Sequence, residues 1–324
     1  MKYTARKLFT LLATMLIVSF LAFFAFSLVS GDAATAQLGT QATAESLAAL
    51  RAELGLDRPL PVRYADWLLS ALHGDFGVSQ HYQMPVSSLL APRLPVTLCL
   101  SVMSFLMIVL VSIPLGVRSV RREGQPGKGR RAAAAFRTTA NQLLMAFPPF
   151  FSSILISWIF GILLHWFQPQ GEFPDFSAHP GLFFWYLLFP AVSIAIPRTA
   201  MAVRMLRSTL LREMNRDYVR TAISRGNDRQ GVLYRHVLKN ALPPVVAFLA
   251  QTMAEVIAGS IVIEQVFGVP GLGRLLLGSI GYRDWTVVEA IILILALWVV
   301  LANTAGDWIA QRIDPRLRLG GGEA

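Results

Sequence analysis

Six long apolar stretches, separated by polar segments rich in arginine, dominate the hydrophobic pattern of this 324-residue chain. Each stretch has about 20 or more mainly apolar residues, which is enough for a helix to cross about 30 Å of hydrocarbon. A backbone in lipid must satisfy its own hydrogen bonds, so every stretch should be helical. We therefore expect an all-α, polytopic transmembrane helical bundle of about six spans. These spans are 8–29, 94–117, 143–167, 182–206, 241–267 and 285–309.

The composition agrees with a membrane protein. Hydrophobic residues make up 54% of the chain and charged residues only 15%, whereas soluble domains average about 25% charged residues. Such a chain could not cover the surface of a soluble fold with polar groups, and its apolar residues come in uninterrupted blocks of membrane-spanning length.

The polar segments between the spans are alternately rich and poor in lysine and arginine. Of the 29 basic residues, 23 lie in the N-terminus, in 118–137, in 198–239 and in the C-terminus, and 6 lie in 30–93 and 268–284. Basic residues accumulate on the cytoplasmic side of a membrane, so both termini should be cytoplasmic. The same distribution explains the net charge of +10. The partner that it implies is a lipid bilayer, and no nucleic acid is expected.

The expected organisation has three parts: 1–93, the first transmembrane helix and an outer cap; 94–310, a transmembrane core; and 311–324, a cytoplasmic tail. The first span could instead be a cleaved signal peptide, because Ala-Thr-Ala at 34–36 resembles a cleavage site. Its apolar core of about 22 residues, however, is longer than the usual 7–15.

The cytoplasmic segment 198–239 is the most informative part of the chain. It is too polar to face lipid, yet its pattern is helical. We expect a short helix that ends at a sharp turn at Gly226, then a second helix, then a proline-marked entry to the fifth span. Such a helix can lie flat against a partner, because small residues let two backbones approach. The alternative is a solvated basic loop that only fixes the topology.

This segment resembles the EAA motif of permeases from binding-protein-dependent ABC importers. It is most similar to the dipeptide, oligopeptide and nickel permease family. The resemblance covers nearly the full chain, because several blocks of sequence match the family in the same order. The matching residues include Pro190, Arg204, Arg207, 217–222 (Asp-Tyr-Val-Arg-Thr-Ala), Gly226, Arg235, His236, 240–243 (Asn-Ala-Leu-Pro), 264–267 (Glu-Gln-Val-Phe), 270–274 (Pro-Gly-Leu-Gly-Arg), Arg283, Asp284 and 314–316 (Asp-Pro-Arg).

The chain departs from the family pattern at two places. Family members usually have Arg-Ala-Lys before the glycine, whereas this chain has Ile-Ser-Arg at 223–225. Arg220 stands where the wider motif has glutamate. These changes weaken an account of docking that rests on charge, but they leave the glycine and the helix intact.

The resemblance implies the fold of a type I ABC importer permease in the bacterial inner membrane. Residues 217–231 would form a coupling helix seated on a cytoplasmic ATPase. The implied partners are a second permease, two ATPase subunits and an outer solute-binding protein. The implied ATPase-coupling residues are Tyr218, Arg220, Thr221, Ala222, Arg225, Gly226, Arg235 and His236. The implied contacts with the binding protein are Pro270, Gly271, Gly273, Arg274, Arg283 and Asp284.

Two acidic residues lie within or beside the fifth span. An ionised carboxylate there is costly, so Glu255 should face a cavity or a charged partner. We assign Glu255 and Glu264 to a translocation pathway. The alternative for Glu255 is a structural role, with its carboxyl protonated or paired with an arginine.

Motifs for catalysis and for cofactors are missing from the sequence. No Walker A motif, HExxH or Gly-x-Gly-x-x-Gly occurs, and the histidines lack metal-ligand spacing. We expect no enzyme activity, cofactor or metal. Peptides are the expected cargo of the importer, with nickel or a metal chelate as the alternative. The rival from another class is a stand-alone secondary transporter or channel.

Overall fold

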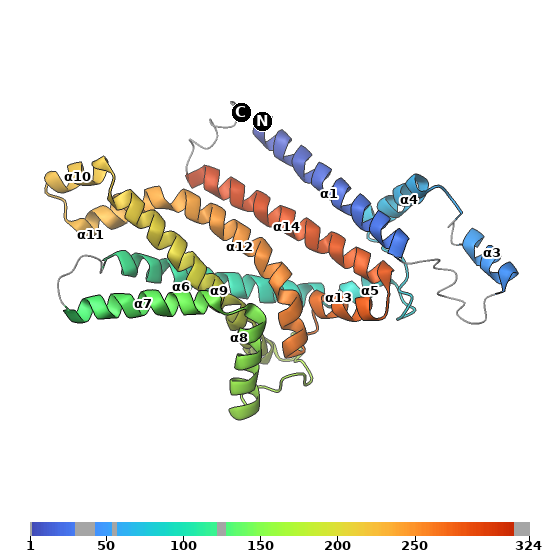
Figure 1. Cartoon of the computed structure of the whole chain (residues 1–324). Helices are drawn as coiled ribbons and strands as arrows, with labels where there is room; N and C mark the ends of the chain where they lie inside the picture. Colours follow the sequence, from blue (N-terminus) through green and yellow to red (C-terminus); the bar gives the residue numbers. More distant parts are fainter. Residues whose placement is uncertain (1, 30–42, 54–56, 122–127, 314–324) are drawn as a thin grey trace. The chain divides into compact units, whose positions relative to one another are not determined.

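A computed structural model describes residues 2–29, 43–53, 57–121 and 128–313, and helices make up the regular structure there (Figure 1). This confirms the all-α fold. Residues 34–36 and 314–316 lie outside the described residues. The elements are α1 Lys2–Val29, α3 Ala44–Glu53, α4 Leu60–Leu72, α5 Val86–Leu90, α6 Leu94–Arg121, α7 Lys128–Ala146, α8 Pro149–Ile156, η2 Ser157–Leu163, α9 Pro180–Met214, α10 Asp217–Ser224, α11 Arg229–Val232, η3 Leu233–Val237, α12 Leu238–Phe267, α13 Leu272–Gly281 and α14 Trp285–Ile313; η2 and η3 are π-helical.

Five of the described helical stretches are long and apolar enough to cross a membrane. A bent helix pair, Ala135–Ala146 with Pro149–Leu163, makes a sixth span if the pair is counted as one. The expectation of about six spans is therefore confirmed. The five stretches are Phe9–Leu28, Val86–Arg121, Pro180–Met214, Arg229–Phe267 and Trp285–Ile313.

The third expected span is broken. α7 ends at Ala146, α8 begins at Pro149, and the two helices are bent by 97°. Proline disfavours a helical conformation in the residue before it and donates no backbone hydrogen bond. Pro148 is accordingly extended, with ψ of 142°. The two prolines therefore end one helix and start another.

The fourth span is longer than the sequence predicted. α9 runs to Met214, eight residues beyond the expected end at 206, and Leu206 and Leu210 are buried along it. The helix continues because its buried side keeps an apolar face while its other side turns polar. Arg198, the first residue of the expected cytoplasmic segment, lies near the middle of α9.

The chain forms two compact units. Unit 1 contains Met1–Val96 and Pro270–Trp298, and unit 2 contains Thr97–Val269 and Val299–Ala324. In unit 1, α1 packs on α4 through aromatic rings. The Tyr64 ring meets those of Phe20 and Phe23 edge to face, and its hydroxyl lies 2.8 Å from the hydroxyl of buried Ser19.

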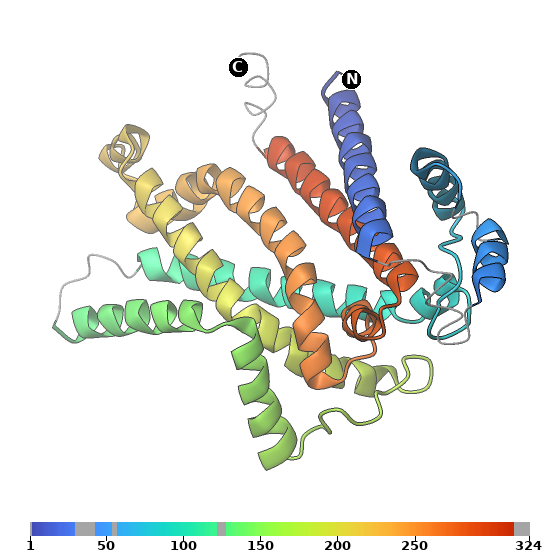
Figure 2. The same ribbon diagram turned by 45° about the vertical axis from the view of Figure 1, so that its right-hand side comes forward.

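Unit 2 is built on α9 and α12, which lie side by side (Figures 1 and 2). Glycines allow close approach elsewhere in this unit. A Cβ added to Gly116 on α6 would lie 2.6 Å from Leu206 on α9. A Cβ on Gly306 of α14 would lie 1.9 Å from that of Ala250 on α12. Small residues at such crossings are typical of helices that pack within a membrane.

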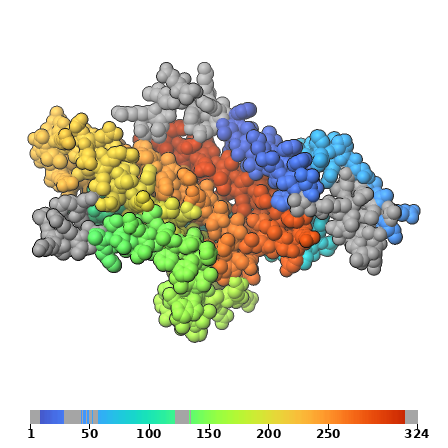
Figure 3. Space-filling model, in the orientation of Figure 1, coloured from blue at the N-terminus to red at the C-terminus, as the bar shows by residue number. Residues whose placement is uncertain are grey.

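α8 packs against α9 and α12 in unit 2, and α8 and η2 form part of the light green surface at the lower edge of the space-filling view (Figure 3). Their outward side chains are large and apolar: Phe150, Ile154 and Trp158 are all exposed. An exposed apolar surface of this kind suits contact with lipid or with another membrane subunit.

Candidate functional site

The polar segment between α9 and α12 is an ordered helix–turn–helix in unit 2. α10 ends at Ser224, and the turn that follows contains Gly226, whose φ of +86° lies in the left-handed region. The Gly226 N–H donates to the carbonyl of Ile223, and the Asn227 N–H donates to that of Ala222. This pair of bonds is the Schellman motif. The Asp228 carboxylate then caps α11 by accepting from the backbone of Gln230 and Gly231.

Apolar residues fasten this segment to unit 2. Val219 is the buried residue of α10, and Val232, Leu233 and Val237 are buried beyond the turn. At the base of α10 the Tyr218 hydroxyl donates to Glu213 over 3.2 Å. Burial raises the pKa of the Tyr218 phenol, so it remains a neutral donor at neutral pH. The segment is thus a fixed projection and not a solvated loop.

The outer surface of the projection carries both charges and apolar groups. Four of the expected coupling residues, Arg220, Thr221, Arg225 and Gly226, are exposed. Ile223 is 44% exposed on α10. Sequence reasoning noted Ile223 only as a departure from the family pattern.

The remaining predicted coupling residues occupy less exposed or different positions. Tyr218 and Ala222 are half-buried. Arg235 and His236 are exposed on the π-helical segment η3, together with Tyr234, which is 49% exposed. The sequence gave no reason to select Tyr234, because a tyrosine next to a polar pair is common in any surface helix.

A second polar cluster lies in unit 1, where the loop before α5 meets the turn between α13 and α14. Asp284 is buried, and its Oδ2 accepts from the Ser79 hydroxyl at 2.5 Å and from the His81 N–H at 3.1 Å. The rings of His81 and Tyr282 stack with centroids 3.7 Å apart. We call Ser79, His81, Tyr282 and Asp284 the loop latch.

The predicted binding-protein contacts divide by exposure. Arg274 and Arg283 are exposed, Pro270 is half-buried, and Gly271, Gly273 and Asp284 are buried. Arg283 has a φ of +58°, which is uncommon for a residue other than glycine. The buried members therefore shape the loop, and only the exposed ones are placed to touch another protein.

Glu264 lies inside unit 2 and is fully buried. Its Oε1 accepts from the Thr97 hydroxyl on α6 at 2.8 Å and from Ser260 at 3.4 Å. Its backbone carbonyl accepts from Val269 just beyond Gly268, whose φ is +71°. The side chain is thus a hydrogen-bonded link between α6 and α12 in this structure.

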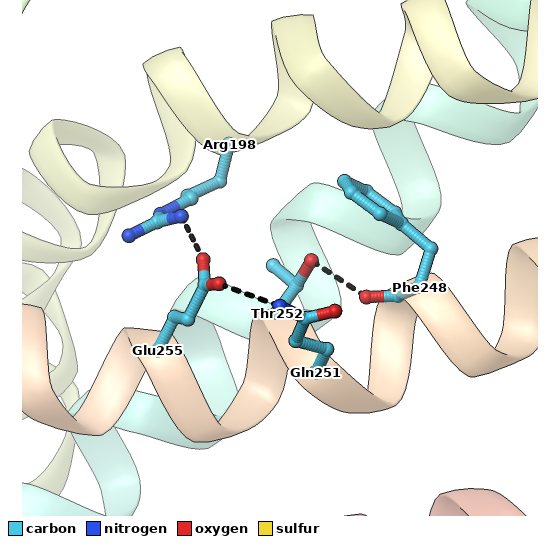
Figure 4. A network of polar contacts seen from close by, with 5 residues as sticks. All are labelled: Arg198, Phe248, Gln251, Thr252 and Glu255. Atoms are coloured by element: carbon cyan, nitrogen blue, oxygen red, sulfur yellow. Dashed lines mark hydrogen bonds and ion pairs between the residues drawn. The ribbon is translucent and has the colours of Figure 1, made fainter.

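Glu255 lies on α12 and forms an ion pair with Arg198 on α9 (Figure 4). Its other carboxylate oxygen accepts from the Gln251 side chain at 3.2 Å. The Arg198 and Glu255 side chains are 22% and 39% exposed, so the pair is not sealed inside the chain. Within the described residues, no group of three His, Cys, Asp or Glu side chains is placed to hold a metal.

These features define a class: a polytopic helical membrane protein that carries an ordered helix–turn–helix between two of its spans. The family model for the binding-protein-dependent transport system inner membrane component matches residues 127–319, and the model for the N-terminal part of such membrane components matches residues 1–101. The chain belongs to this family. It is therefore a permease subunit of an ABC importer in the inner membrane, not an enzyme, and it works with ATPase and binding-protein partners.

Curated relatives match along nearly their full length. A probable peptide ABC transporter permease of Sinorhizobium fredii is 33% identical over 98% of this chain and 99% of its own length. A putative peptide transport system permease protein of Brucella abortus is 36% identical over 94% and 95%. The glutathione transport system permease protein GsiC of Salmonella typhi is 33% identical over 98% and 99%.

A solved structure shares the fold. An inward-facing structure of the MetNI methionine ABC transporter contains a chain that aligns with a TM-score of 0.55. The alignment covers 70% of this chain and 96% of that chain, at 19% sequence identity. The similarity confirms the expected permease fold and carries no information on the cargo.

Proposed function

We propose that the chain is the permease of a di- or oligopeptide importer. The relatives that match along nearly their whole length are named for peptides and for glutathione, itself a peptide. These names do not favour the alternative of nickel or a metal chelate. A stand-alone secondary transporter or channel does not fit the family, whose members work with a binding protein.

The proposed assembly contains a second permease, two ATPase subunits and an outer solute-binding protein. In this assembly α10 and α11 bind to an ATPase subunit. The observation that supports this is the projection itself, which is anchored by buried Val219 and presents exposed Arg220, Ile223 and Arg225 outward. An ordered helix pair can transmit a movement of the ATPase subunit to α9 and α12, the two long helices that flank it.

The proposed orientation has both termini in the cytoplasm. It puts the projection inside the cell and the loop latch outside, and the asymmetry of lysine and arginine supports it. The exposed Arg274 and Arg283 then face the solute-binding protein, and buried Asp284 holds the shape of their loop.

A pair of glycines provides the test of coupling. Gly226 and Gly74 both end a helix in a Schellman motif, with φ of +86° and +81°, and a Cβ on either would meet nothing within 4 Å. The Cβ of a valine at either position therefore meets no other atom, and the positive φ adds backbone strain of about 1–2 kcal/mol. We expect Gly226→Val to reduce ATPase co-purification and uptake and Gly74→Val to leave ATPase co-purification intact. If the two variants behaved alike, the coupling assignment would be wrong.

A further inference from the structure

The ion pair between Arg198 and Glu255 joins α9 and α12, two helices that are each long and apolar enough to cross a membrane. Arg198 is the nineteenth of the 35 residues of α9, and Glu255 is the eighteenth of the 30 residues of α12. Charged side chains within membrane-spanning segments avoid lipid and instead face water, a partner or a substrate pathway. Since both side chains remain partly exposed in unit 2, the pair has an open side.

The exposed side of α12 continues in both directions from Glu255. The residues on this side recur at intervals of three or four along the helix, so they share one face. Half of the face is polar or charged, which does not suit contact with hydrocarbon. Its members are Ala247, Gln251, Glu255, Ala258, Val262 and Gln265.

We propose that Arg198, Gln251 and Glu255 form a site in the translocation pathway that binds the charged ends of a passing peptide. The Arg198 guanidinium takes the α-carboxylate, and the Glu255 carboxylate with the Gln251 amide oxygen takes the α-ammonium group. The ligand class is a zwitterionic peptide with free termini. This inference rests on the proposed function.

The geometry explains why a pair suits this role better than a single charge. Without cargo the guanidinium and the carboxylate neutralise each other, and Gln251 holds the second carboxylate oxygen. A zwitterion brings one charge of each sign, so it can exchange with the pair while every charge keeps a partner. An isolated charge within a membrane-spanning segment would have no partner between transport cycles, which is costly.

Thiol accessibility tests whether the site faces a pathway. In a Cys99→Ser background, Gln251→Cys is compared with Leu110→Cys, a position on α6 that is 69% exposed and apolar. The whole importer, reconstituted in vesicles, is treated with two thiol reagents. One is the cationic 2-aminoethyl methanethiosulfonate, and the other is the anionic 2-sulfonatoethyl methanethiosulfonate. We expect the thiol at 251 to react about tenfold faster than the thiol at 110, because thiolate forms only in contact with water. Equal rates would overturn the proposal.

Trialanine tests the ligand class. During ATP-driven turnover, trialanine should slow the reaction at position 251, whereas N-acetyl-trialanine amide, which has no charged terminus, should not. Equal protection by both peptides, or by neither, would overturn binding of the termini. Uptake of trialanine should fall about tenfold or more in Glu255→Gln and Arg198→Gln, since each loses one charged contact.

The outcomes separate this inference from the function on which it rests. If the unsubstituted importer failed to take up trialanine, the peptide cargo and the site would both be wrong. If it took up trialanine while Glu255→Gln and Arg198→Gln did so at the same rate, the proposed function would stand and the site would be wrong. Unchanged ATPase co-purification in both variants shows that any loss is not a failure of assembly.

Discussion

Asp284 accepts a hydrogen bond of 2.5 Å from Ser79, a residue 205 positions earlier in the chain, and so joins two loops of unit 1. The same carboxylate oxygen accepts from the His81 N–H. Asp284→Ala would leave both donors without this acceptor in a buried site. We expect a loss of about 1–3 kcal/mol in the stability of the unit, measured as a lower thermal unfolding temperature of the importer in detergent.

An exposed aspartate in the same unit is the control for this prediction. Asp66 pairs with Arg58 over 3.3 Å, and both side chains are more than half exposed. Exposed pairs contribute about 0–1 kcal/mol, so Asp66→Ala should have little effect. If the two alanine variants unfolded at the same temperature, the loop latch would not contribute to stability. Uptake should fall only in Asp284→Ala if the latch holds the loop that meets the binding protein.

The hydrogen bond from Thr97 to Glu264 makes a second prediction, because it links α6 to α12 inside unit 2. Thr97→Val and Glu264→Gln each weaken this bond while nearly preserving side-chain volume. Residues in one hydrogen bond couple by about 0.5–3 kcal/mol. The double variant should therefore lose less stability than the sum of the two single losses. Strict additivity in thermal unfolding would show that the bond makes no contribution.

Local features of the fold were predictable from the sequence. A glycine after a short polar helix and before Asn227 signals a helix end with positive φ, and Gly226 has it. The apolar stretches predicted the spans, because length and hydropathy are properties of the chain alone. The break at Pro148 and Pro149 was not predictable, since sequence rules allow either a kink or a complete break there.

Contacts between distant residues were not predictable. The sequence suggested an arginine partner for Glu255 as one alternative, but nothing in it selected Arg198, 57 positions away. Counting charges grouped Arg198 with the cytoplasmic arginines and gave no indication of this pair, because a lone arginine at the edge of an apolar stretch is usually a topology signal. The link from Ser79 to Asp284 was likewise invisible, since it depends on how two loops fold together.

Close packing of α14 on α12 gives a third prediction. A Cβ at Gly306 would lie 1.9 Å from the Ala250 Cβ, so even Gly306→Ala forces the helices apart. Overpacking of this kind costs about 1–3 kcal/mol. Thermal unfolding should show the loss, and adding Ala250→Gly should restore part of it. Gly259→Ala is the matched control, because a Cβ there meets nothing within 4 Å; an equal loss in this control would exclude the packing explanation.

The proposed orientation gives the last prediction, which thiol labelling checks directly. In a Cys99→Ser background, Asn227→Cys on the projection and Gln80→Cys beside the loop latch both place a thiol at an exposed position. A membrane-impermeant maleimide should label position 80 in intact right-side-out vesicles and position 227 only in inverted ones, because the basic residues around the projection hold it in the cytoplasm. Lysed vesicles, in which both positions should react, provide the control for reactivity. Labelling of position 227 in intact right-side-out vesicles would contradict the orientation, and the ATPase contact would have to be abandoned with it, since ATP is supplied on the cytoplasmic side.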